Sequence, residues 1–156
     1  MENKEIGRKR ENLTRLTKYL LDFMFYSGIV VTLTLPLSVK LVGKYIQRLA
    51  DHYQESVIIY FVLGVAAVIL IGELRKMFST VLNHDCFVVD NVQSLRQMGN
   101  LSFFIAAMSV VRSIVYVTMA MAVVILVFII AGLFSKVLAL VFEEAVAYKE
   151  ENDLTI

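Results

Sequence analysis

Four long apolar runs dominate this chain and constrain its fold more than any other feature. They cover residues 19–42, 56–72, 101–117 and 118–142, with charged stretches before, between and after them. A helix needs on the order of 20 mostly apolar residues to cross a bilayer core, and it satisfies its backbone polar groups within its own segment. The sequence therefore predicts an all-α membrane protein with a bundle of four transmembrane helices.

Composition and the cysteine count exclude several classes of protein. Hydrophobic residues make up 58% of the chain and charged residues 19%, whereas about a quarter of an average soluble domain is charged. The single cysteine, Cys86, excludes an internal disulfide, a redox pair and a thiolate zinc site. His52 and His84 lie outside the apolar runs, although a membrane haem would need axial histidines within helices. We therefore expect no enzyme activity, no cofactor and no metal site, and interpret His84 and Cys86 as loop residues.

Charge placement predicts the orientation. Residues 1–18 carry six basic side chains against three acidic ones, and such a segment stays in the cytoplasm by the positive-inside rule. The loop at 73–100 adds further basic residues. With four spans, the acidic tail at 143–156 returns to the same side. Both termini and this loop are thus predicted to be cytoplasmic.

The last two runs form one continuous stretch that must turn back. A single helix over residues 101–142 would measure about 63 Å, about twice the hydrocarbon thickness. The polar or amphipathic residues near the middle of this stretch are Arg112, Ser113, Tyr116 and Thr118. They place the hairpin tip at 116–119. The alternative is a three-span protein in which residues 91–112 lie on the membrane surface and the tail is outside.

The connection between the first two runs has its own pattern. Residues 44–55 place apolar side chains at helical spacing among charged ones, which is typical of an amphipathic connector on the membrane surface. A ligand-binding rim is the alternative. Pro36 is predicted to bend the first helix near its outer end.

Charged residues inside spanning helices are costly and need a partner or a purpose. Asp22 and Lys136 have similar predicted depths in the first and last helices, so we predict an ion pair between them. Alternatively, Lys136 extends to the headgroups while Asp22 stays hydrated. Arg112 is expected to extend to the outer interface or to meet Glu55 or Asp51.

Small residues in the last run predict close helix packing. Ala131, Ser135 and Ala139 recur at every fourth position, a pattern that lets helix backbones approach in lipid. Packing within the bundle is favoured over a contact between copies in a homo-oligomer.

Two polar segments resemble the signature segments of a known family. In residues 85–99, the matching positions are Phe87, Asn91, Leu95, Arg96 and Gly99, while Cys86 replaces a proline; the second segment is 142–156. They resemble the YoaS-like proteins, small four-span bacterial membrane proteins of unknown function. The resemblance implies a multi-pass protein of the bacterial cell membrane. It also implies a small helix-turn-helix regulator as a cytoplasmic partner, so that nucleic acid is not bound directly.

Both segments fall on the predicted cytoplasmic face. We therefore predict a regulatory scaffold or sensor that docks a cytoplasmic partner. The candidate docking residues are Phe87, Asn91, Leu95, Arg96, Glu150, Glu151 and Asp153. The residues of the first segment would equally well cap and seat the cytoplasmic helix. An immunity protein or small transporter that acts on a membrane-active molecule is the alternative function, and a polar cavity in mid-membrane would favour it.

Overall fold

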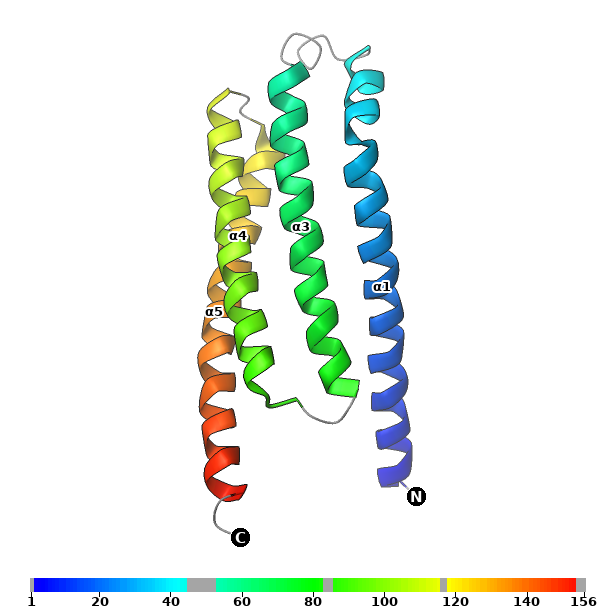
Figure 1. Ribbon diagram of the computed structural model, residues 1–156, viewed down its shortest axis with the longest axis vertical. Helices are drawn as coiled ribbons and strands as arrows, with labels where there is room; N and C mark the ends of the chain where they lie inside the picture. Colours follow the sequence, from blue (N-terminus) through cyan, green and yellow to red (C-terminus); the bar gives the residue numbers. More distant parts are fainter. Residues whose placement is uncertain (1, 45–52, 83–85, 116–117, 154–156) are drawn as a thin grey trace.

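The chain folds into long helices that lie side by side. The computed structural model describes residues 2–44, 53–82, 86–115 and 118–153. These residues form α1 (Glu2–Gly43), α3 (Tyr53–Leu82), α4 (Val89–Val115) and α5 (Met119–Asp153). The helices alternate in direction, so both termini lie at one end and the α3–α4 turn lies there too (Figure 1). The all-α prediction is confirmed for the described residues.

The helices pack in chain order. α1 contacts α3, α3 contacts α4 and α4 contacts α5, whereas α1 contacts neither α4 nor α5 over the described ranges. The arrangement is therefore an open row with α1 at one edge, and the first and last helices are not neighbours.

The placement of apolar and polar side chains is the reverse of that in a soluble protein. Large apolar side chains cover the outer faces of α1 and α5, and serines and Asn91 are the largest fully buried side chains. Soluble monomers rarely expose so much contiguous apolar surface. Within the described residues, α1, α3 and α5 are long and apolar enough to cross a membrane. These observations support insertion into a bilayer.

α4 differs from the other three helices and is not among the candidate spans. Its buried side includes a row of polar residues: Asn91, Ser94, Ser102, Ser109 and Arg112. The helix lies beside α3 and α5 and runs opposite to both (Figure 1). Four helices are thus confirmed in the described part of the chain, while a fourth span remains a prediction.

Small residues permit close contact at the interfaces. A Cβ atom on Gly64 of α3 would lie 2.9 Å from Oγ1 of Thr32 on α1, and one on Gly132 of α5 would lie 3.0 Å from the ring of Phe103 on α4. In the predicted row of α5, Ser135 and Ala139 are buried against α4 and Ala131 is half-buried. This row therefore serves packing within the molecule.

Several sequence predictions lie outside the described residues. They concern the connector at 45–52, the loop residues at 83–85, the tip at 116–117 and the end at 154–156. Around these positions, α4 ends at Val115 and α5 begins at Met119. Pro36 lies inside α1, which continues to Gly43.

Candidate functional site

Asn91 ties the start of α4 to the end of α3. Its side chain is fully buried, with 0% exposed. Its Nδ2 donates to the carbonyl of Cys86 and to Oγ1 of Thr80, both at 2.7 Å, and Thr80 Oγ1 donates to the carbonyl of Met77. A buried amide stabilises the fold only when its polar atoms are satisfied in this way. Asn91 therefore fixes the turn between the two helices.

Two further polar contacts join neighbouring helices at this end. Ser94 of α4 donates to Oε2 of Glu73 on α3 at 2.6 Å. Asp22 of α1 forms an ion pair with Arg75 of α3, and the Arg75 guanidinium lies 5.4 Å from the centre of the Phe25 ring. The second contact combines charge pairing with a cation–π interaction. Together they link α1, α3 and α4 through side chains rather than through apolar packing alone.

The predicted ion pair between Asp22 and Lys136 is wrong. Their helices do not touch in the part of the chain that the structure describes, and Asp22 pairs with Arg75. The alkyl chain of Lys136 instead packs against Gly99 of α4, where a Cβ atom would lie 3.0 Å from Lys136 Cγ. The physical reason is the open row, which places α3 and α4 between the two residues.

Arg112 is also placed differently from the expectation of an extended side chain at the outer interface. It is 6% exposed, its Nη2 donates to Tyr60 Oη at 2.6 Å, and its guanidinium lies 4.1 Å from the Tyr60 ring centre. Arg112 therefore belongs to the polar contact between α3 and α4. The expected alternative of a contact with Asp51 falls outside the described residues.

A groove lies between the start of α4 and the last turns of α5. We call it the valine groove; its volume is about 380 Å³ and its lining is Val89, Val92, Gln93, Arg96, Glu143 and Val146. Val92 and Val146 are buried, whereas Val89 is 62% exposed. At the rim, Arg96 Nη2 donates to both carboxylate oxygens of Glu143, at 2.9 and 2.8 Å. The groove thus combines an apolar surface with a neutralised ion pair.

The last turns of α5 extend beyond the groove. Figure 1 shows α5 continuing past the first residues of α4 at the end that carries both termini. Glu144, Glu150 and Glu151 are exposed on this segment. We call residues 143–153 the acidic helix; its acidic residues outnumber its single basic residue, Lys149.

The predicted docking residues separate into two groups. Asn91 and Leu95 are 0% and 3% exposed, so they seat α4 and cannot contact a partner. Phe87, Arg96, Glu150 and Glu151 are exposed. The ring of Phe87 also packs against that of Phe142 in a tilted arrangement, with ring centres 5.4 Å apart. The side chain of Asp153 is not among those that the structure describes. The docking prediction is therefore corrected for the two buried positions.

Sequence reasoning missed residues that the structure brings to this end. Val89, Gln93 and Glu143 line the valine groove, and Ser94 and Glu73 join α3 to α4. A signal for α4 was available, because its buried polar residues recur at helical spacing. No sequence signal pairs α4 with the end of α5. Among the described residues, no three His, Cys, Asp or Glu side chains are grouped to hold a metal.

Comparison with known proteins adds a family match. Residues 23–156 match a family model described as "Protein of unknown function (DUF2975)". The match begins within α1, after the basic segment, and includes the valine groove and the acidic helix. No curated protein and no solved structure matches the chain.

Proposed function

The chain belongs to the DUF2975 family of proteins of unknown function, and we propose that it is a multi-pass membrane protein that docks a basic cytoplasmic protein. The docking site is the valine groove together with the acidic helix. The role is that of a regulatory scaffold in the bacterial cell membrane. The motifs at 85–99 and 142–156 support a place among the YoaS-like proteins.

The proposed topology has four spans with both termini in the cytoplasm. α1, α3 and α5 have the length and apolarity of spans, and α4 lies beside α3 and α5 along their length. Its polar row contacts partners on α3, including Glu73 and Tyr60, which lowers the cost of placing this helix in lipid. The basic residues of 1–18 favour the cytoplasm for the end with both termini.

The observation that carries the docking proposal is the exposed acidic helix beside an apolar groove. Bundle packing uses Val146 of this segment, which is buried, but leaves Glu144, Glu150 and Glu151 exposed. Arg96 and Glu143 neutralise each other at the rim. The electrostatic potential around the groove therefore comes mainly from the other carboxylates of the acidic helix. Complementary charge favours a basic partner and speeds its association.

A helix-turn-helix regulator fits this chemistry, because DNA-binding proteins carry clustered basic residues. Such a partner would place an apolar side chain in the valine groove and basic side chains along the acidic helix. The alternative of transport or immunity within the membrane has less support. The valine groove lies near the end of the helices that carries both termini, and this placement favours docking at the surface.

Site-specific photocrosslinking in cells tests the proposal. A photoreactive amino acid at Gln93, which is exposed in the groove, should crosslink one basic cytoplasmic protein. The E150K/E151K variant should reduce that crosslink, whereas the matched control E55K should not, because Glu55 is exposed at the opposite end. In detergent extracts, the interaction should also weaken as salt rises above about 0.15 M.

Two results would overturn the proposal. Crosslinks to lipid alone, or to a second copy of the chain, would assign the groove to another occupant. A crosslinked protein whose yield is unchanged in E150K/E151K would show that the acidic helix takes no part. Membrane levels of each variant, measured in the same cells, separate loss of docking from loss of folding.

A further inference from the structure

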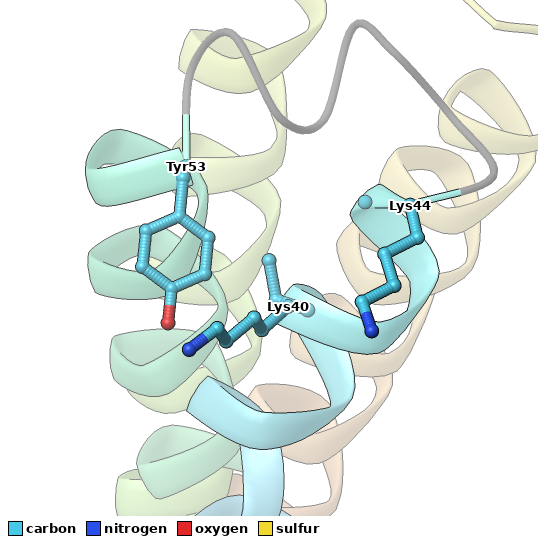
Figure 2. Close-up of a pocket in the computed structure, with 5 residues that line it drawn as sticks. Lys40, Lys44 and Tyr53 are labelled. Carbon is cyan, nitrogen blue, oxygen red and sulfur yellow. The ribbon is translucent and has the colours of Figure 1, made fainter.

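A second hollow lies at the end of the molecule opposite to the termini. It is formed by the last turn of α1 and the first residue of α3, and its volume is about 450 Å³. Its lining consists of Val39, Lys40, Gly43, Lys44 and Tyr53 (Figure 2). We call it the lysine hollow. The docking function proposed above does not involve this end.

Tyr53 forms a fixed wall of the lysine hollow. Its hydroxyl donates to the carbonyl of Pro36 on α1 at 3.1 Å, which joins the start of α3 to α1. Val39 is buried behind the hollow, and Gly43 has no side chain to fill it. The hollow is therefore part of the contact between α1 and α3.

Two lysines and Tyr53 line the hollow. Lys40 lies in the last turn of α1 and Lys44 directly follows its end at Gly43, so the two lysines are about one helical turn apart. Figure 2 shows the Lys40 amine extended toward the Tyr53 hydroxyl, with Lys44 one turn further along. Among the residues that the structure describes, no carboxylate lines the hollow, and no salt bridge joins either lysine to an acidic side chain. The hollow is thus a cationic site suited to an anion.

The position of the hollow indicates which anion. It lies at the end of the apolar segment Asn12–Gly43, where lipid headgroups meet water. A row of exposed leucines continues from the lysines toward the middle of α1: Leu41, Leu37 and Leu33. Their spacing of four residues places them on one side of the helix, and this side is continuous with Lys40 and Lys44.

We propose that the lysine hollow binds the phosphate of an anionic phospholipid, with one acyl chain lying along Leu41, Leu37 and Leu33. The two lysines contact the phosphate, and the Tyr53 ring supports the headgroup. Basic pockets between membrane helices bind anionic headgroups in this manner. Lysines that only extend to the bulk headgroup layer need neither a hollow nor a fixed aromatic wall. Free phosphate would satisfy the amines but would leave the leucine row unused.

Tryptophan quenching by brominated lipids tests the site in the full-length protein. The chain contains no tryptophan, so Leu37→Trp, at a position 65% exposed, introduces a single reporter beside the proposed acyl chain. The protein is reconstituted once with brominated phosphatidylglycerol in phosphatidylcholine and once with brominated phosphatidylcholine in phosphatidylglycerol. Comparing the quenching in the two mixtures gives the relative binding constant of the two lipids. Each lysine near an anionic headgroup raises the binding constant about fivefold. With two lysines, the expected preference for phosphatidylglycerol over phosphatidylcholine is therefore about 25-fold.

The matched variants decide the origin of this preference. K40Q/K44Q should bring the relative binding constant close to one. R15Q/K18Q removes the same charge from the other end of α1 and should leave the preference unchanged. Equal losses in both double variants, or no preference in the parent protein, would overturn the proposal. If inorganic phosphate at matched ionic strength abolishes the preference, the hollow binds free phosphate and the lipid assignment fails.

Discussion

Replacing Asn91 by alanine should destabilise the contact between α3 and α4 more than any exposed substitution on the same helix. The variant loses the two Nδ2 hydrogen bonds to Cys86 O and Thr80 Oγ1, each worth roughly 1 kcal/mol net. It also leaves the carbonyl of Cys86, a half-buried residue, without this donor, which adds roughly 1–2 kcal/mol. Thr80 keeps its bond to Met77, so we expect a total of about 3–4 kcal/mol.

The chain supplies a matched control on the same helix. Asn100 is exposed, so Asn100→Ala should change the free energy of unfolding by no more than about 0.5 kcal/mol. Asn91→Asp provides a second test, because a carboxylate retains the shape but cannot donate to the carbonyl of Cys86. It should be at least as destabilised as Asn91→Ala.

Equilibrium unfolding in mixed micelles with increasing sodium dodecyl sulfate, followed by circular dichroism, gives the required free energies. The lack of tryptophan rules out intrinsic tryptophan fluorescence as the signal. Similar midpoints for Asn91→Ala and Asn100→Ala would refute the reasoning, since they would show that the buried amide adds no stability at the turn. A fully stable Asn91→Asp would refute the assignment of Nδ2 as the essential donor.

The Asp22–Arg75 pair, the close approach at Gly64 and the exposure of Cys86 can each be tested. Asp22→Asn and Arg75→Met should each lower stability in the same assay, and the double variant should lose less than the sum because the residues are paired; simple additivity would contradict the pair. Gly64→Ala should cost about 1–3 kcal/mol through overpacking against Thr32, and adding Thr32→Ala should recover part of this loss; no recovery would place the strain elsewhere. Cys86, the lone thiol, should resist a membrane-impermeant maleimide in intact cells and react after lysis; labelling of intact cells would contradict a cytoplasmic α3–α4 turn.

Sequence reasoning succeeded for the helices and failed for some of their partners. The apolar runs identify α1, α3 and α5 because length and apolarity are local properties. The docking residues were harder to predict. Phe87 and Arg96 are exposed, but Asn91 and Leu95 of the same motif are buried, and a motif does not state which of its residues face inward.

The sequence by itself determined that this is a chain of long helices with an apolar exterior, a basic beginning and an acidic end. Only the tertiary structure decided which helices are neighbours, and with them the pairing of Asp22 with Arg75 instead of Lys136. The physical reason is that lipid is as apolar as leucine, so apolar faces do not select a neighbour in a membrane. Selection falls to small residues such as Gly64 and to buried polar groups such as Asn91, whose partners lie far away in the sequence or across a turn.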